Sequence, residues 1–371
     1  MGETQAEDER AYWLALLRLP AIGAAGARLL LSRFGSPRQL FEAGDAAWYD
    51  AKLPAAARAY LGNPIWAEIG ADLAWLAQPQ HHLLTLNDPD YPPLLREISD
   101  PPPVLFIHGD PALLLTPQLA VVGSRNPSPA GERTATDFAA HLSRAGLTVT
   151  SGMAIGIDAA AHRGALQVPA PTLAVAGTGL DRVYPAQHRD LAHAIAERGA
   201  LVSEFPIGTP PRPDHFPRRN RIISGLALGT LVVEAAPQSG SLITARLAAE
   251  QGREVFAIPG SIHNPLSRGC HALIRQGAKL VETGQDILEE LAGFTSSKLS
   301  FTQNTVLSGS DAENVHEFSS LLNSLGFEPT SIDAVVERSG LTTEQVSSML
   351  VVLELHGKVI SGPGGLYTRM P

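Results

Sequence analysis

The most basic segment of the chain is HFPRRNR, in which Arg218, Arg219 and Arg221 stand within four residues. Arg212 lies just upstream, and Asp214 is the one acidic residue close by. A guanidinium group stays charged in any environment and binds phosphate oxygens through paired hydrogen bonds. A solvated charge run at a helix start is the alternative. The apolar IISGLALG that follows favours arginines anchored beside an anion site.

Glycine-rich loops follow six short apolar runs, in the segments VVGSR, TSGMAIGID, AGTGLD, SEFPIG, EAAPQSGS and PGS. Glycine lets the backbone approach a ligand closely, and a helix that starts behind such a loop offers free N–H groups. In a parallel sheet all these loops emerge at one edge. Together they predict an anion site, with phosphate as the expected group.

Three single features of these loops have two readings each. Phe216 either stacks on a nucleic-acid base or faces the core. Ser239 or Ser241 caps a helix, using the same N–H groups that an anion would bind. Arg125 follows a buried strand directly, so it needs an anionic ligand or a carboxylate such as Glu234 as its partner.

Evidence for catalysis is weaker. Asp158, Asp181, Glu204 and Glu234 all follow strands, which leaves an acid–base pair open. The sequence contains no HExxH, no GxSxG, no Walker-type phosphate loop and no G-x-G-x-x-G after its first core strand. Cys270 is expected to be a small buried side chain. We therefore expect no enzymatic activity, no metal and no cofactor.

Composition limits the classes of function. The formal net charge is −9, so any binding of nucleic acid requires positive charge that is local and directed. No run of eighteen uncharged apolar residues occurs, and the start MGETQAEDER is polar and acidic, unlike a secretory signal. The single cysteine excludes an internal disulfide. These features predict a cytoplasmic protein without a membrane span.

The apolar runs LAVVG, LTVTSG, TLAVAG, ALVSE, TLVVEA, EVFAIPG and AKLVE alternate with amphipathic helical stretches between Leu119 and Ala292. Continuous apolar strands separated by helices predict an α/β fold with a mostly parallel, Rossmann-like sheet. We expect a small helical domain over 1–80, this core over 81–292, a polar linker over 293–314 and a winged helix over 315–371. In the last segment, KVIS, GPGG and LYTR read as strand, turn and strand.

The chain resembles the DprA family of DNA-processing proteins, also called Smf. The resemblance rests on YPPLLREISDPPPVLFIHGD, VVGSR, SGMAIGIDAAAHRGAL, GTGLDRVYP, SEFPIGTPP, FPRRNRIISGL, VVEAAPQSGSLITA, QGREVFAIPGSI and GCHALIRQGAKLV, which occur in the family's order. LPAIGAAGARLLLSRFGS resembles the family's N-terminal helical domain, which is related to SAM and helix-hairpin-helix folds. The last segment resembles its winged helix.

The resemblance implies binding of incoming single-stranded DNA during natural transformation (competence) and DNA recombination, displacement of single-strand-binding protein, and loading of the recombinase RecA. It also implies a homodimer, with His271, Ile274 and Leu280 at the interface. Some members carry lysines where Ala186 and Pro213 stand here, and Arg189 and Arg212 are expected to replace them. The predicted DNA site comprises Gly123, Ser124, Arg125, Gly152, Gly177, Gly179, Arg189, Arg212, Phe216, Arg218, Arg219, Asn220, Arg221, Ser239, Gly240 and Ser241.

Two other functions were weighed. Phosphoribohydrolases that activate cytokinins share a related core, but their PGGxGT signature is replaced here by EAAPQSGSLIT. A winged-helix transcription regulator requires cations on its recognition helix, whereas TTEQVSSMLVVLELHG contains two glutamates and no Lys or Arg. We therefore expect the winged helix to contact protein or to regulate.

Overall fold

The computed structural model describes residues 9–298, 321, 324–325, 330–355, 359–362 and 366–369. It divides into two compact units, 1–295 and 296–371. The first unit begins with six helices, α1 (Glu9–Leu16), α2 (Ala24–Phe34), α3 (Pro37–Glu42), α4 (Asp45–Asp50), α5 (Ala55–Gly62) and α6 (Trp66–Leu76). They enclose an aromatic core of their own, which Val104 and Phe106 of the following sheet complete.

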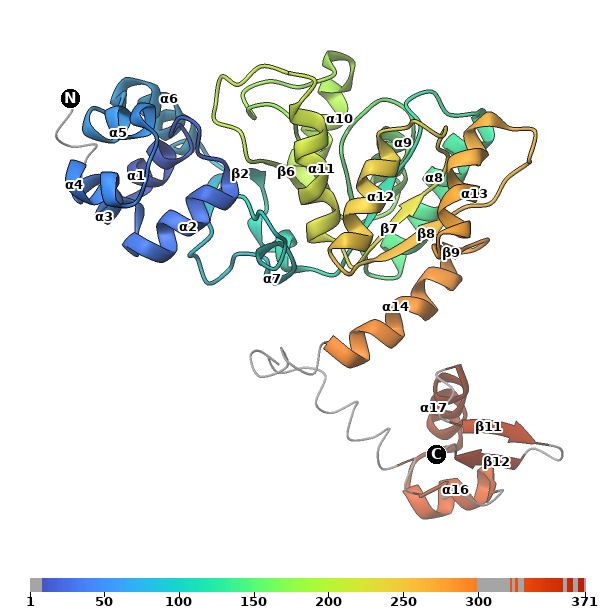
Figure 1. The fold of residues 1–371 in the computed structure, drawn as a ribbon. Helices are drawn as coiled ribbons and strands as arrows, with labels where there is room; N and C mark the ends of the chain where they lie inside the picture. Colours follow the sequence, from blue (N-terminus) through green and yellow to red (C-terminus); the bar gives the residue numbers. More distant parts are fainter. Residues whose placement is uncertain are drawn as a thin grey trace. The chain divides into compact units, whose positions relative to one another are not determined.

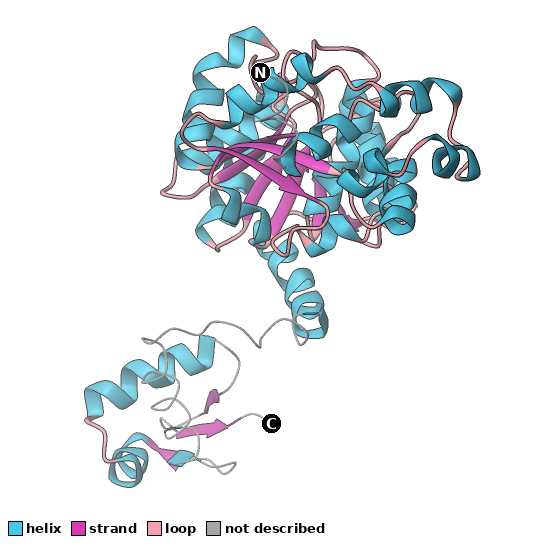
Figure 2. Ribbon diagram, turned by 90° about the vertical axis from the view of Figure 1, so that its left-hand side faces the viewer, coloured by secondary structure: helices cyan, strands magenta, loops and turns pink. Residues whose placement is uncertain are grey.

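A nine-stranded sheet forms the centre of this unit, with helices on both sides (Figure 2). Its strands are β1 (His81–Thr85), β2 (Val104–Gly109), β3 (Gln118–Val122), β4 (Thr148–Ser151), β5 (Thr172–Val175), β6 (Ala200–Ser203), β7 (Gly229–Val232), β8 (Glu254–Ala257) and β9 (Lys279–Leu280). Their order is β1-β2-β6-β5-β4-β3-β7-β8-β9. Along this order, the strands from β6 to β9 are parallel to one another. β2 runs antiparallel to both of its neighbours, β1 and β6.

The connecting helices are α7 (Pro93–Arg96), α8 (Pro129–Arg144), α9 (Ile157–Leu166), α10 (Arg189–Arg198), α11 (His215–Leu226), α12 (Ser241–Glu250), α13 (Arg268–Arg275) and α14 (Gly284–Lys298) (Figure 1). Successive residues of β3 point to opposite faces of the sheet. Ala120 and Val122 join one buried cluster with α11 and α12, and Leu119 and Val121 join another with α8 and α9. Burial on both faces explains why these strands are apolar throughout.

The second unit contains β10 (Thr330–Ser331), α16 (Ile332–Ser339), α17 (Thr343–Leu355), β11 (Val359–Gly362) and β12 (Leu366–Arg369). Its three strands are ordered β10-β12-β11, and β11 pairs with β12 in antiparallel register. Val335, Val346 and Leu350 lie in its core. The predicted strand–turn–strand arrangement is confirmed for the two strands.

The predicted fold class is confirmed: an α/β fold with a mostly parallel sheet, N-terminal helices and a C-terminal winged helix. One difference concerns the segment predicted as a linker from residue 293. There, α14 continues to Lys298, because FTSSK contains no proline to interrupt the helix. Residues 299–314, the rest of that segment, lie outside the described residues.

Candidate nucleic-acid interface

A cleft of about 660 Å³ opens at the carboxyl ends of β3 and β7. The order of the strands reverses between these two strands, since β4, β5 and β6 follow on one side and β8 and β9 on the other. Open α/β sheets bind ligands at such a switch point. One wall of the cleft is the loop after β3, the opposite wall is the start of α12, and α11 contributes a third side.

The loop after β3 is fixed by backbone hydrogen bonds on both sides. The Ser124 N–H donates to the Glu234 carbonyl at 2.7 Å, and the Ser124 carbonyl accepts from Ile157 N–H at 3.1 Å. A Cβ on Gly123 would lie 2.7 Å from Ile157 Cγ1 and 2.9 Å from the Glu234 carbonyl oxygen, so this close approach requires glycine. The loop is therefore held rigidly where it enters the cleft.

Arg125 stands exposed at the mouth of the cleft, over an aromatic pair. Its guanidinium carbon lies 5.9 Å from the centroid of the Phe216 ring, whose own centroid is 5.4 Å from that of Tyr184. Within the described residues Arg125 has no ion pair or hydrogen-bonded partner, and the carboxylate proposed for it, Glu234, binds Ser128 N–H and Oγ at 2.8 and 2.7 Å instead. The guanidinium is thus available to an anion, above a ring on which a base can stack.

Arg219 lines the floor of the cleft but is only 4% exposed. One of its terminal nitrogens donates to the Gly152 carbonyl at 2.7 Å and also to the carbonyl of Val175, so it joins the ends of β4 and β5. Burial lowers the pKa of Arg219 to about 10, against the attraction of Asp158. Its charge lies beneath the cleft, where it contributes potential. One terminal nitrogen is used by the protein, whereas Nε is buried without a hydrogen-bond partner among the described residues.

Asp158 is a carboxylate that lines this cleft and is therefore the first candidate there for acid–base chemistry. Burial raises its pKa, and the charge of Arg219 and the N–H groups of Ala154 and Gly152 oppose that shift. The Gly152 and Ala154 N–H groups donate to one carboxylate oxygen at 3.1 and 3.4 Å. The carboxylate thus closes the turn after β4, which is a structural task.

The opposite wall carries Ser239, Gly240 and Ser241 at the start of α12. Gly240 is the N-cap and has no side chain, but Ser239 Oγ accepts from Ser241 N–H at 3.3 Å and lies 2.7 Å from Ser241 Oγ. Ser239 thus caps the first N–H group of α12, and the positive end of the helix dipole lies at the cleft. Asn220 of α11 lies half-buried beside it and also lines the cleft.

Arg218 and Arg221 do not line the cleft, although they belong to the same basic segment. Arg221 is buried and donates to both oxygens of Glu204, at 3.1 and 2.8 Å, and to Asp100 at 2.8 Å. Arg218 pairs with the same glutamate at 2.9 Å and lies over the Phe205 ring. The helix directs these two side chains towards carboxylates of the protein itself. These ion pairs could not be predicted, because Asp100 and Glu204 are distant from the arginines in the sequence.

The remaining predicted residues are distributed around the site. Gly177 supports it, because a Cβ there would lie 2.9 Å from Phe216 Cδ1. Gly179 donates to the Thr209 carbonyl and lies beside Asp181. Arg189 lines a separate pocket beside α10. Arg212 is exposed and lines neither that pocket nor this cleft. The structure thus assembles nine predicted residues in the cleft: Gly123, Ser124, Arg125, Phe216, Arg219, Asn220, Ser239, Gly240 and Ser241.

Among the residues of the cleft that were not predicted from the sequence, Tyr184 and Ile243 are large and exposed. Tyr184 is 48% exposed and packs against Phe216, and Ile243 is 39% exposed on the first turn of α12. Tyr184 follows the glycine loop AGTGL by several residues, so its position after a strand was a usable signal. Ile243 stands in a helical apolar pattern, and nothing in that pattern distinguishes it from a core residue.

Three further features concern metals, membranes and the single cysteine. In the part of the chain that is described, no group of three or more His, Cys, Asp or Glu side chains is arranged to hold a metal ion. No helix among those residues is both long and apolar enough to cross a membrane. Cys270 is fully buried, as expected, and burial raises the pKa of its thiol to about 11.

Comparison with known proteins places this chain among the DNA recombination-mediator proteins. Residues 82–292 match the family model described as DNA recombination-mediator protein A, and residues 310–365 match that of the DprA winged helix domain. The chain belongs to this DprA (Smf) family of DNA-processing proteins.

Similarity extends well beyond the core. The chain is 48% identical to Protein Smf of Escherichia coli over 81% of each chain, and 34% identical to Protein Smf of Synechocystis over 98% of this chain and all of that one. The X-ray structure of DNA processing protein A from Streptococcus pneumoniae covers 76% of this chain and 97% of its own, with 39% identity and a TM-score of 0.68. DNA processing protein A from Helicobacter pylori, described in terms of a single-stranded DNA binding mode, covers 57% and 97%, with 29% identity and a TM-score of 0.52.

Proposed function

We propose that this protein binds single-stranded DNA in the cleft between β3, α11 and α12, and that it acts on DNA as a mediator and not as an enzyme. The observation that carries the proposal is Arg125, an unpaired guanidinium over the Phe216 ring at the mouth of the cleft. A cation beside a stacking surface is how proteins hold a flexible strand without reading its sequence.

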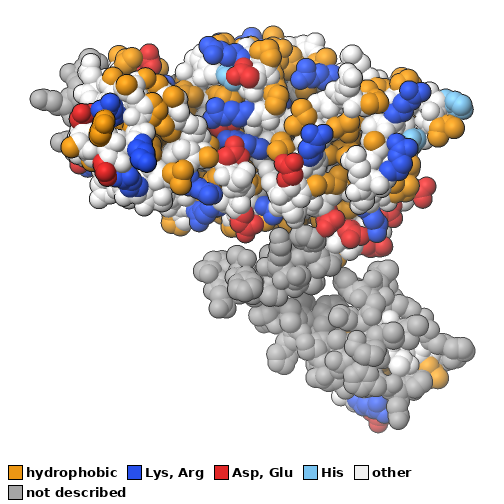
Figure 3. All heavy atoms as spheres, viewed as in Figure 1, with side chains coloured by type: hydrophobic (Ala, Val, Ile, Leu, Met, Phe, Trp, Pro, Cys, Tyr) orange, Lys and Arg blue, Asp and Glu red, His pale blue; other side chains and the backbone are white. Residues whose placement is uncertain are grey.

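The distribution of cations around the cleft favours a strand over a duplex. Arg125 of the β3 loop is the exposed cation among the residues that line the cleft, and the first turn of α12 has small polar side chains. On the face seen in Figure 3, the Lys and Arg side chains lie as separate groups among acidic and apolar ones. Such a surface offers little to a duplex backbone, which is bound through broad positive charge.

The role in recombination follows from the family. We propose that the bound strand is passed to RecA and that single-strand-binding protein is displaced in the process, as the sequence resemblance implies. The Helicobacter pylori relative, described as having a single-stranded DNA binding mode, supports the first step of this role. The winged helix is proposed to contact protein, because the sequence of α17 contains glutamates and no Lys or Arg.

We also propose that the protein acts as a homodimer through the β9 end of the sheet. Leu280 of this edge strand is 43% exposed and Ile262 nearby in the chain is 73% exposed. Ile274 of α13 packs partly on the core, and the His271 ring bonds to Gly260. β9 is a short edge strand of Lys279 and Leu280, and an exposed apolar side chain at an open sheet edge is suited to contact with a second copy. Light scattering of Leu280→Glu should report a folded monomer, and a dimer would refute the interface.

Fluorescence anisotropy with a labelled oligothymidylate and with a duplex of equal length tests the main proposal. We expect tighter binding to the single strand at every salt concentration, with an affinity that falls as salt rises. Equal binding to both, or binding only to the duplex, would contradict the assignment of the cleft. A RecA-dependent strand-exchange assay, with single-strand-binding protein present, then tests the mediator role separately.

A further inference from the structure

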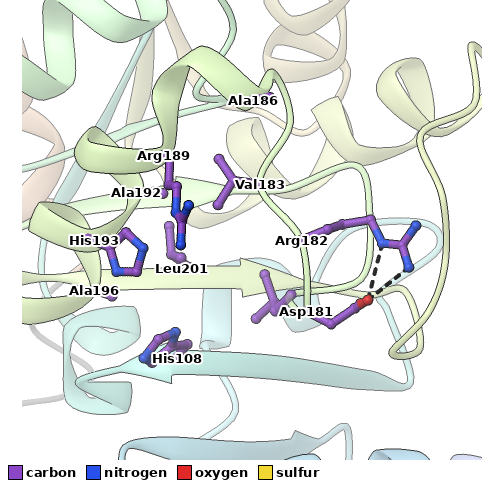
Figure 4. A pocket seen from close by; sticks show the side chains of 11 residues that line it. His108, Asp181, Arg182, Val183, Ala186, Arg189, Ala192, His193, Ala196 and Leu201 are labelled. Atoms are coloured by element: carbon purple, nitrogen blue, oxygen red, sulfur yellow. Dashed lines mark hydrogen bonds and ion pairs between the residues drawn. The ribbon is translucent and has the colours of Figure 1, made fainter.

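A second pocket, of about 410 Å³, lies beside α10 on the far side of the loop 180–186 (Figure 4). Arg189, Ala192, His193 and Ala196 line it from α10, and this spacing of three and four residues places them on one helix face. β2 contributes His108 and β6 contributes Leu201. The pocket therefore combines an apolar floor with cations and imidazoles.

The charges in this pocket are not balanced by the protein. Arg182 donates through Nε and one terminal nitrogen to Asp181, at 3.2 and 2.8 Å, and Asp181 is the one carboxylate among the described residues that line the pocket. Arg189 is exposed, and its side chain has neither a hydrogen bond nor an ion pair within the described residues; its backbone N–H donates to the Ala186 carbonyl. One arginine is thus left for an anion after the internal pair is formed.

The His108 imidazole lines the pocket and packs against other rings. Its ring lies 4.4 Å from that of His81, which in turn stacks on Trp75 at 3.9 Å. Burial, with the neighbouring His81 and His193, lowers the pKa of His108, so the ring is neutral at pH 7. A neutral, fixed imidazole near apolar Leu180, Val183 and Leu201 suits a base more than a second phosphate.

The pocket and the cleft share one loop. Val183 lines the pocket and Tyr184, the next residue, lines the cleft. Consecutive Cα atoms are about 3.8 Å apart, so the two hollows adjoin at this loop. A strand that extends from the cleft over Tyr184 therefore has the pocket as a neighbouring surface.

We propose that the pocket formed by α10, β2, β6 and the loop 180–186 is a second nucleotide subsite, in which Arg189 binds a phosphate and the base packs beside His108 and His193. This proposal rests on the proposed binding of single-stranded DNA in the cleft. The nucleotide belongs to the strand that continues from the cleft. A free nucleoside monophosphate has the same chemistry and is distinguished by the test.

The test compares oligothymidylates of two lengths, about six and about twenty nucleotides, because single-strand grooves take roughly 4–16 nucleotides. Binding is measured for the full-length wild type, for Arg189→Ala/His193→Ala and for Arg144→Ala. Arg144 is an exposed arginine of α8 that lines neither hollow. Thermal melting should show that all three are equally stable, because the substituted side chains are exposed.

We expect the double variant to lose roughly tenfold or more in affinity for the long strand and less than about twofold for the short one, since stacking and phosphate contacts in one subsite are worth about 1–3 kcal/mol. Arg144→Ala should match the wild type. An equal loss at both lengths, or no loss at either, would overturn the second subsite.

Titration with thymidine monophosphate separates this inference from the function on which it rests. If the wild type binds neither oligonucleotide, the proposed function fails. The pocket is then supported only by monophosphate binding that the double variant lacks, and an absence of that binding would overturn it as well. If the strand binds as expected and the free monophosphate does not, the occupant is the strand.

Discussion

The loop after β3 and the helix α11 both bring arginines to one edge of the sheet, yet their arginines have different surroundings. Arg125 of the loop is exposed, lies over the Phe216 ring and has no ion pair among the described residues. Arg221 of the helix is buried between Glu204 and Asp100. Both side chains are permanent cations, so their partners, not their charge, decide which one is available to DNA.

This difference changes how the basic segment HFPRRNR is understood. As a sequence it predicts a cluster of phosphate contacts, whereas in the structure its arginines hold the protein together. Arg219 joins β4 to β5 and Arg221 joins α11 to the residues before β2 and after β6. The segment builds the cleft, and the loop after β3 supplies the cation that meets the ligand.

The largest effect is expected from Arg221→Met. Without Arg221, the buried Glu204 carboxylate keeps only Arg218 as an ion-pair partner, and that side chain is half-exposed. Removing one partner of a buried ion pair costs about 3–5 kcal/mol, so we expect a loss towards the lower end of that range. Chemical unfolding of the variant should show a loss of that order. Arg221→Met combined with Glu204→Leu should lose less than the sum of the two single variants, and strict additivity would show that the pair is not coupled.

Phe216→Ala should weaken DNA binding by about 1–3 kcal/mol, because a base loses its stacking surface and Arg125 loses its support. Its effect on stability is expected to be smaller than that of Arg221→Met, since Phe216 is only half-buried. Phe205→Ala is a useful comparison, because this ring lies under Arg218 away from the cleft. Equal losses of affinity in the two variants would contradict the proposal that a base stacks on Phe216.

A buried histidine behind Arg219 gives a smaller effect that depends on pH. Burial, with His188 and Arg219 nearby, lowers the pKa of His162 to about 3. Between about pH 6.5 and 3, His162 is therefore protonated in the unfolded chain but not in the folded one. The free energy of unfolding falls as the pH drops through this range. Between about pH 7 and 5.5 this histidine should lower the stability by roughly 1 kcal/mol. The stability of His162→Gln should fall less over the same range, and a parallel fall would exclude His162 as the cause.

The sequence allowed the architecture and about half of the candidate site to be predicted. The uncharged strands and the glycine loops after them indicated a parallel sheet and its binding edge, because both follow from local pattern and from the geometry that all such sheets share. The direction of each arginine on α11 was not predictable. It depends on Asp100 and Glu204, which lie 121 and 17 residues from Arg221 in the chain.

The same limit applied to Arg189 and Arg212. Both were expected in the cleft because of their position near family lysines, and both follow loops whose path the sequence does not specify. The structure places Arg189 on α10, which forms the neighbouring pocket. The sequence therefore predicted the helices and strands better than it predicted which distant residues each arginine contacts.

The salt dependence of Arg125→Ala tests the central claim most directly. Single-strand affinity is measured across a salt series for the wild type, Arg125→Ala and Arg144→Ala, with unfolding followed in parallel. The account predicts unchanged stability within about 0.5 kcal/mol and a slope of log affinity against log salt that is less steep by about 0.7, the share of one phosphate contact. Arg144→Ala should keep the wild-type slope. A wild-type slope in Arg125→Ala would contradict the claim that this arginine meets the DNA backbone.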